Sequence, residues 1–164
     1  MRVYLPTTLA GLRTALDAGE LVTATGYAVT PALREWYVEG DLEELEYAAT
    51  GAAARASLRC LAEGDETTAR RVVLAVELPD EAVRPAPDVH RAAVRLAAPV
   101  PWPAVDSALV DDPSAADDVR LALTVLTAAD AGDDDALFTV DALDDHELGW
   151  YAAQELSALV ALEP

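Results

Sequence analysis

The sequence predicts a mixed α/β (α+β) fold in a single domain over residues 1–164, with a five-stranded mixed sheet packed with about five or six helices. Three observations lead to this prediction. The length of 164 residues suits one domain, short apolar runs alternate with helical patterns, and the later strands follow one another without intervening helices. The early strand–helix–strand order predicts parallel neighbours, and the later order predicts antiparallel ones.

Five short runs of β-forming or continuously apolar residues predict the strands. The run from Arg71 to Leu78 contains Val-Val-Leu-Ala-Val, as a strand covered on both faces requires. The Pro-rich residues 79–87 predict a loop, and residues 99–103 predict an extended connection. In chain order, the predicted strands are residues 3–5, 24–29, 71–78, 92–97 and 107–110.

Capping patterns predict where the helices begin. Thr, Ser or Asp precedes each helical pattern, and Asp41 with Glu44 forms an acidic capping box. Pro31 takes the first position of the second helix, and Gly19 ends the first. The predicted helices run from Thr7 or Thr8 to Gly19, from Thr30 to Glu39, from Asp41 to about Ala62, from Ser114 to about Ala129, and from Asp144 through Leu159.

The chain is strongly acidic. Its formal net charge is −19, and all 11 of its basic residues are Arg. Residues 106–164 contain 15 acidic residues and Arg120 as their one basic residue. Such a field repels phosphate backbones and anionic membrane surfaces, so we expect neither nucleic acid nor a membrane as a partner. It would attract a basic partner, although solubility alone also explains a charge of this kind.

A cytoplasmic location is expected. The single Cys60 allows no internal disulfide, which suits a reducing compartment. The first residues lack the pattern of a signal peptide, and no apolar run reaches the roughly 18 to 20 residues needed to cross a bilayer. The sequence also lacks a Gly-rich phosphate loop, a nucleophile elbow and a dinucleotide-binding fingerprint, so we expect no cofactor.

Two helix starts suggest a site for an anion. If the first two strands are parallel, their carboxyl ends bring Thr7, Thr8 and Thr30 to one edge of the sheet, where open α/β sheets bind ligands. Helix N-termini present N–H groups to an anion, and Arg34 lies one turn into the second helix. The alternative, which we favour, is that the three Thr residues are ordinary N-caps.

Two acidic patterns resemble metal sites without meeting their requirements. Asp111 and Asp112 end a predicted strand, but they lack a fixed ligand spacing, and we interpret them as solvated. His146-Glu147 resembles the start of a zinc-protease helix, but Trp150 stands where the second His ligand is required. We therefore expect no metal.

Two clusters of aromatic and polar residues are the strongest candidates for a binding surface. One is Arg-Glu-Trp-Tyr at residues 34–37, and the other is a face of the last predicted helix on which His146, Trp150 and Gln154 recur one turn apart. Aromatic rings beside polar groups anchor partners or stack on flat ligands, but Trp and Tyr also fill Ala-rich cores, and we favour this core interpretation for the Trp and Tyr side chains of both clusters. The candidate ligand-binding residues are Thr7, Thr8, Thr30, Arg34, Trp36, Tyr37, His146, Trp150, Tyr151 and Gln154, and none is assigned a catalytic role.

Three segments are similar to an uncharacterised family of actinobacterial proteins. They are MRVYLPTT at residues 1–8, AVTPALREWY at residues 28–37 and DHELGWYAAQE at residues 145–155. The resemblance extends over nearly the whole chain and implies a GC-rich actinobacterial source. It implies no activity, and no catalytic residue is carried over from it.

The sequence favours a non-enzymatic binding or regulatory module whose partner is an unidentified protein or small molecule. The alternative is a small hydrolase-like enzyme in which Asp111 or Glu147 acts with His146, and the Thr-capped helix ends bind an anion. Exposed Trp side chains would favour the module. Convergence of His146, Arg34 and acidic groups in one cleft would favour the enzyme.

Overall fold

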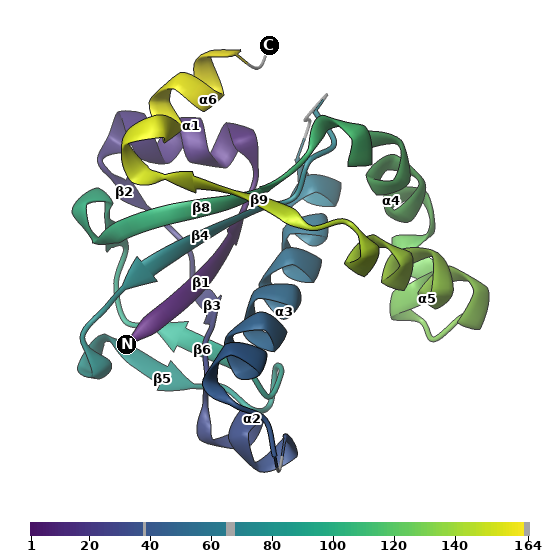
Figure 1. Cartoon of the computed structure of the whole chain (residues 1–164), viewed down its shortest axis with the longest axis horizontal. Coiled ribbons are helices and arrows are strands. Elements are labelled where there is room, and N and C mark those ends of the chain that lie inside the picture. The colour runs from purple at the N-terminus through teal and green to yellow at the C-terminus, as the bar shows by residue number, and fades with distance from the viewer. Residues whose placement is uncertain (38, 65–67, 163–164) are drawn as a thin grey trace.

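An open seven-stranded sheet forms the centre of the computed structural model, which describes residues 1–37, 39–64 and 68–162 (Figure 1). Its strands are β1 (Arg2–Thr7), β3 (Thr25–Tyr27), β4 (Val72–Glu77), β5 (Val83–Pro85), β6 (Ala93–Leu96), β8 (Val105–Asp111) and β9 (Leu148–Ala152). Their order across the sheet is β5-β6-β3-β1-β4-β8-β9. Separately, β2 (Glu20–Leu21) pairs with β7 (Val100–Pro101).

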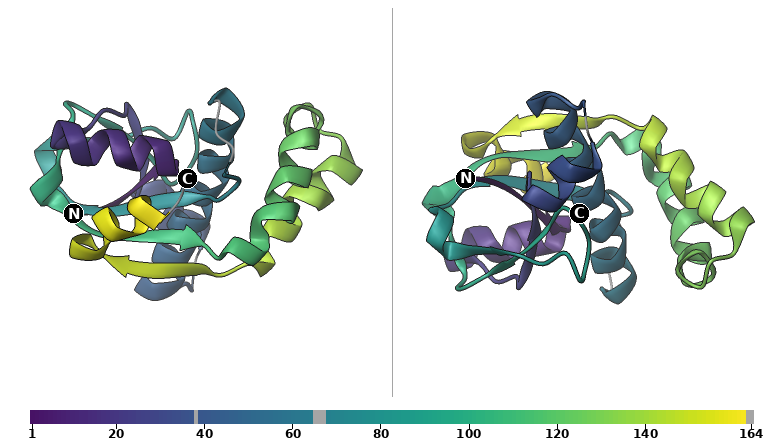
Figure 2. Two further views of the ribbon diagram at one scale, coloured as in Figure 1. Left: turned by 90° about the horizontal axis from the view of Figure 1, so that it is seen from above. Right: turned by 90° about the horizontal axis from the view of Figure 1, so that it is seen from below.

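Helices cover both faces of this sheet and also extend beyond it (Figure 2). They are α1 (Leu9–Ala18), α2 (Pro31–Trp36), α3 (Leu42–Glu63), α4 (Ala116–Asp130), α5 (Asp134–Asp141) and α6 (Leu156–Leu162). α1 and α6 pack on one face and α3 packs on the other, while α4 and α5 project past the end of the sheet. Among the described helices, none combines the length and the apolar character needed to cross a membrane.

The first three helices begin at the caps predicted from the sequence. Gly11 N donates to Thr8 Oγ1 over 3.0 Å, and Leu33 N donates to Thr30 Oγ1 over 3.1 Å. The Asp41–Glu44 capping box is present at the start of α3. α2 ends at Trp36 rather than at Glu39, and residue 38 of that predicted helix lies outside the described residues.

The expectation of a five-stranded mixed sheet is wrong in both strand number and strand direction. Every neighbouring pair in the described sheet is antiparallel. One added strand, β5, lies inside the predicted Pro-rich loop, and Pro85 is tolerated there because an edge strand leaves its outer N–H position unpaired. The other added strand is β9, at the opposite edge.

The predicted helix that begins at Asp144 is also wrong. Residues 142–145 form a short 3₁₀ turn, residues 148–152 form β9, and α6 begins at Leu156. β9 pairs with β8 in a register that sets Trp150 opposite Leu109. The tertiary pairing therefore overrides a local pattern that resembles a helix start.

The start of α4 differs from its prediction as well. Ser114 does not cap α4; instead Asp112 caps a 3₁₀ turn that precedes the helix, because its carboxylate accepts a hydrogen bond from Ser114 N over 2.9 Å. This turn covers residues 113–115, and α4 then begins at Ala116.

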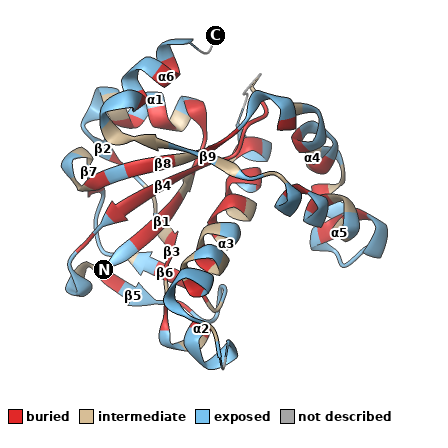
Figure 3. Cartoon of the chain, in the orientation of Figure 1, coloured by how far each residue is buried: buried red, intermediate tan, exposed pale blue. Residues whose placement is uncertain are grey.

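Alternate residues of the sheet build two separate cores. Val3 and Leu5 of β1 pack toward α1 and α6, whereas Tyr4 packs toward α3. α3 presents small side chains such as Ala49 and Ala53 to the sheet, so its backbone approaches the strands closely. A third core joins the C-terminal half of α3 to α4 and α5, whose outer faces are exposed (Figure 3).

Candidate functional site

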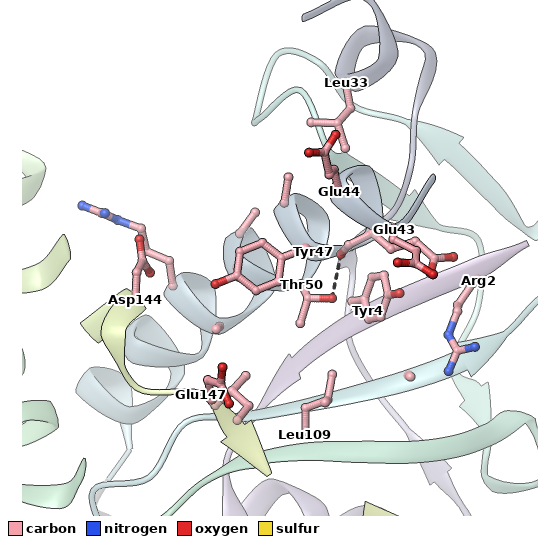
Figure 4. Close-up of a pocket in the computed structure, with 18 of the residues that line it drawn as sticks. Arg2, Tyr4, Leu33, Glu43, Glu44, Tyr47, Thr50, Leu109, Asp144 and Glu147 are labelled. Atoms are coloured by element: carbon pink, nitrogen blue, oxygen red, sulfur yellow. Dashed lines mark hydrogen bonds between the residues drawn. The ribbon is translucent and has the colours of Figure 1, made fainter. Parts of the chain in front are cut away.

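An open groove of about 1550 Å³ lies on the α3 side of the sheet. Its floor includes Tyr4 of β1, Leu109 of β8 and Trp150 of β9, and its walls are α3 and the segment of residues 144–147. Figure 4 shows Tyr47 and Thr50 of α3 facing Asp144 and Glu147 of that segment, with Leu109 below them in this view. We call this feature the groove.

The groove exists because the helices leave part of the sheet uncovered. α3 packs over β1, β3 and β4, and α4 and α5 extend outward from the end of the sheet (Figure 1). The face of β8 and β9 beside α3 therefore carries no helix. Leu109 and Leu148 are half-buried there, and Trp150 is 61% exposed.

α3 supplies one wall through residues that recur about one turn apart. Glu43, Tyr47, Thr50 and Ala54 all line the groove, and this spacing places them along one side of the helix. Tyr47 is 72% exposed. A large aromatic ring held on a rigid helix, and not covered by the protein itself, is available to a partner.

A buried ion pair holds the opposite wall in place. The guanidinium of Arg71 donates from Nε to Asp111 Oδ2 over 2.9 Å and from an Nη atom to Asp111 Oδ1 over 2.8 Å. The same side chain donates to the carbonyl oxygen of Leu143 over 3.0 Å and to that of His146 over 3.3 Å. Both charged groups are almost fully buried, so the interpretation of Asp111 as a solvated residue is wrong. Arg71 therefore connects the segment of residues 143–146 to β4 and β8 by hydrogen bonds.

The carboxylates of the groove lack ion-pair partners in the part of the chain that the structure describes. Six acidic residues line the groove, and none forms an ion pair with another described residue. They are Glu39, Glu43, Glu44, Glu46, Asp144 and Glu147. The groove therefore carries a net negative field.

The cations of the groove are largely engaged elsewhere. Arg2 pairs with Asp106 over 3.1 Å, Arg55 pairs with Asp141, and Arg71 pairs with Asp111. Each of these three carboxylates lies outside the groove lining.

At the far end of the groove, Arg91 stacks on Trp36 with its Cζ 3.4 Å from the ring centroid. Burial lowers the pKa of the nearby His90, and the charge of Arg91 lowers it further. His90 thus favours its neutral form and adds little positive charge to the groove.

Two other titratable groups of the groove have shifted pKa values. Burial raises the pKa of the Tyr4 hydroxyl, the charge of Glu46 raises it further, and a hydrogen bond with Thr50 opposes both effects. Burial also raises the pKa of Asp144 above 3.8, opposed by Arg71 and supported by Asp141. Tyr4 therefore keeps its proton at neutral pH, and Asp144 is the groove carboxyl whose charge is suppressed by its surroundings.

Three of the ten candidate residues from the sequence line the groove: Tyr37, His146 and Trp150. Trp36, 64% exposed, lies next to it beneath Arg91. These exposures contradict the interpretation of Trp36 and Trp150 as core residues. Tyr151, by contrast, is partly buried and packs against the core on the α1 side of the sheet.

The remaining candidates lie elsewhere. β1 and β3 are antiparallel, with Tyr4 opposite Tyr27, so Thr7 and Thr8 lie at one end of this pair and Thr30 at the other. The three Thr residues are buried and do not form one anion site; Thr8 and Thr30 serve as caps. Arg34 is exposed on α2 outside the groove lining.

The proposed helical face of His146, Trp150 and Gln154 does not exist. Trp150 lies in β9, and Gln154 is exposed in the following 3₁₀ turn. His146 points its Nε2 to Asp118 Oδ2 at 2.8 Å. Among residues 1–37, 39–64 and 68–162, no group of three or more His, Cys, Asp or Glu side chains could hold a metal ion.

Most of the α3 wall was not predicted from the sequence. Glu43 and Tyr47 lie opposite the buried stripe of Leu45 and Ala49, where a solvated face is the ordinary expectation. The available signal was an aromatic residue within an acidic helix face. Leu109 and Asp144 gave no such signal, because their role depends on the position of β9.

A family model described as "Family of unknown function (DUF6912)" matches residues 1–160. The chain belongs to this family, which confirms the expectation of an uncharacterised family. No curated protein and no solved structure matches the chain.

Proposed function

We propose that this member of a family of unknown function is a non-enzymatic binding module, and that its groove holds a positively charged segment of a partner protein. One observation carries the proposal: exposed Tyr47 and Trp150 border a groove whose six carboxylates have no ion-pair partner among the described residues. Arg and Lys side chains bind carboxylates and also stack on aromatic rings. A segment rich in them would satisfy both features together.

The size of the groove favours a polypeptide over a small molecule. Sites for small ligands typically have volumes of about 300 to 1,000 Å³ and enclose most of the ligand. This groove is larger, at about 1550 Å³, and it is open to solvent. Surface aromatic residues and Arg are also the residue types that contribute most to protein–protein binding.

His146 and Glu147 both line the groove, but the other groups on which the hydrolase alternative depends lie apart from them. Both carboxylate oxygens of Asp111 accept hydrogen bonds from Arg71, and Arg34 is outside the groove lining. The helix starts at Thr8 and Thr30 lie at opposite ends of the β1–β3 pair. This separation supports a binding module over an enzyme that would need these groups in one cleft.

A charge series of peptides tests the proposal. Three fluorescent peptides of equal length, in which Val alternates with Arg, Gln or Glu, would be titrated with the protein and followed by fluorescence anisotropy. We expect the Arg peptide to bind, the Gln and Glu peptides not to bind, and added salt to weaken binding by screening. Equal affinity for the Arg and Gln peptides would contradict the proposal.

Binding of the Arg peptide should also depend on pH through Asp144. Burial raises the pKa of Asp144, so its carboxylate is less favourable in the free groove than in water, whereas a bound guanidinium favours the carboxylate. Affinity should therefore fall as pH decreases through the pKa of Asp144, above the pH at which ordinary carboxyls protonate. In the same anisotropy titration, the affinity of Asp144→Asn should no longer fall in this pH range, above the pH at which ordinary carboxyls protonate. Identical profiles for the two proteins would contradict the assignment.

We further propose that the protein acts in the cytoplasm of a GC-rich actinobacterium. The single Cys60 suits a reducing compartment, and a chain with 11 Arg and no Lys suits a GC-rich genome. A cytoplasmic partner with a basic segment is the corresponding expectation.

A further inference from the structure

β9 forms an open edge of the main sheet beside the groove. It is the last strand in the sheet order and pairs on one side with β8. Gly149 and Trp150 are both exposed. An edge strand of this kind presents backbone N–H and C=O groups that another strand can use.

The hydrogen bonds of β8 determine which residues of β9 point outward. Asp111 N donates to the carbonyl of Arg71, so the backbone groups of Asp111 and Leu109 point toward β4. Those of Val110 and Ala108 therefore point toward β9, where they face Gly149 and Tyr151.

The backbone groups of Leu148 and Trp150 consequently point away from β8. Ala152 follows the same alternation, and its N–H donates to Glu155 Oε2 over 2.8 Å rather than to β8. Among the described residues, none forms a backbone hydrogen bond with the outward N–H and C=O groups of Leu148 and Trp150. Their side chains line the groove, so the open edge and the groove meet at these two residues.

Acidic residues flank this edge at both ends. Asp144, Asp145 and Glu147 precede β9, and Glu155 follows it. The nearby His146 is already engaged with Asp118. An incoming strand with basic side chains would therefore be attracted at both ends of β9.

We propose that the partner binds as an extended basic segment that adds a strand to the edge of β9. Backbone hydrogen bonds to Leu148 and Trp150 would fix its position, and its side chains on the α3 side would reach the Trp150 ring and the carboxylates of the groove. This inference rests on the proposed function, since it specifies how the basic segment is held.

Charge favours this occupant over a second copy of the chain. In an antiparallel β9–β9 pairing, the acidic residues that precede β9 in one copy, such as Asp145, would come near Glu155, which follows β9 in the other copy. Like charges brought close together repel each other, and each chain carries a net charge of −19. A strand with basic side chains would instead be attracted to the acidic residues that flank β9.

Amide hydrogen exchange, followed by NMR with and without the alternating Arg-Val peptide, tests the strand addition. We expect the N–H groups of Leu148 and Trp150 to exchange at least about tenfold more slowly in the complex. If the peptide binds while these two amides exchange at an unchanged rate, strand addition is wrong and the proposed function stands. If the peptide does not bind, the proposed function itself fails. Slow exchange in the peptide-free protein together with a dimeric mass would overturn the proposal in favour of a second copy.

A pair of substitutions at one position gives an independent test. Leu148→Pro removes the outward N–H, which the pairing with β8 does not use, whereas Leu148→Ala keeps this N–H and removes most of the side chain. We expect Leu148→Pro to bind the Arg-Val peptide about tenfold more weakly than Leu148→Ala. Unchanged β8–β9 cross-peaks in the NMR spectrum would verify that the proline variant is folded. Equal affinities in two folded variants would overturn strand addition.

Discussion

Asp111→Ala is expected to lower the free energy of unfolding by about 3 to 5 kcal/mol, because it leaves the buried guanidinium of Arg71 without its carboxylate. Burying an unpaired charge is far more costly than losing a solvated one. Natural domains have a total stability of about 5 to 15 kcal/mol, so the loss is a large fraction of the whole. Urea denaturation followed by circular dichroism measures it.

Asp106→Ala is the matched control for this prediction. Asp106 also lies on β8 and also pairs with an Arg, Arg2 at 3.1 Å, but this pair is exposed to solvent. We expect its removal to cost less than about 1 kcal/mol. Similar losses in the free energy of unfolding for the two Asp variants would show that burial does not make the Arg71–Asp111 pair more important for stability than an exposed pair.

The double variant Arg71→Leu/Asp111→Leu separates the charge pair from the packing around it. Removing both charges leaves no unpaired ion, so the double variant should be more stable than Asp111→Ala. It also removes the hydrogen bonds from Arg71 to the carbonyls of Leu143 and His146, so the wall of the groove loses its attachment. We therefore expect weaker binding of the Arg-Val peptide even where stability is recovered.

Trp150→Ala is expected to weaken binding of the Arg-Val peptide by about thirtyfold, equivalent to about 2 kcal/mol. The ring is 61% exposed on the groove floor, where a guanidinium can stack on it. Its loss should affect binding more than stability, because most of the residue is exposed. Anisotropy titrations of the folded variant measure the effect.

Phe138→Ala provides the control for Trp150→Ala. Phe138 is also an exposed aromatic residue, at 78%, but it lies on α5 outside the groove lining. Its substitution should leave the affinity unchanged. Comparable losses in the two variants would indicate nonspecific contact with exposed aromatic residues rather than binding in the groove.

Local patterns predicted the elements whose formation depends on local chemistry. The strand at β4 followed from a continuous apolar run, and α3 followed from its capping box at Asp41. The direction of the sheet did not follow, because β1 pairs with β3 on one side and with β4 on the other, and both partners run antiparallel to it. A strand–helix–strand order therefore does not fix parallel neighbours.

The candidate site was predictable in residue type but not in position. Trp36, Tyr37 and Trp150 were identified from their chemistry, and all three are exposed in or beside the groove. The segment containing Trp150 was expected to be a helix, because its edge pairing with β8 depends on residues about 40 positions earlier. That pairing decides which side chains enter the groove.

The measurement that tests the central claim most directly is an NMR titration of the protein with the Arg-Val peptide, with backbone amides assigned. If the peptide binds in the groove, the largest changes in amide chemical shift are expected at Tyr47, Glu147 and Trp150, with little change along α5 despite its acidic first turn. Changes spread over α4 and α5, or concentrated on α1 and α6, would contradict the assignment of the groove as the binding site.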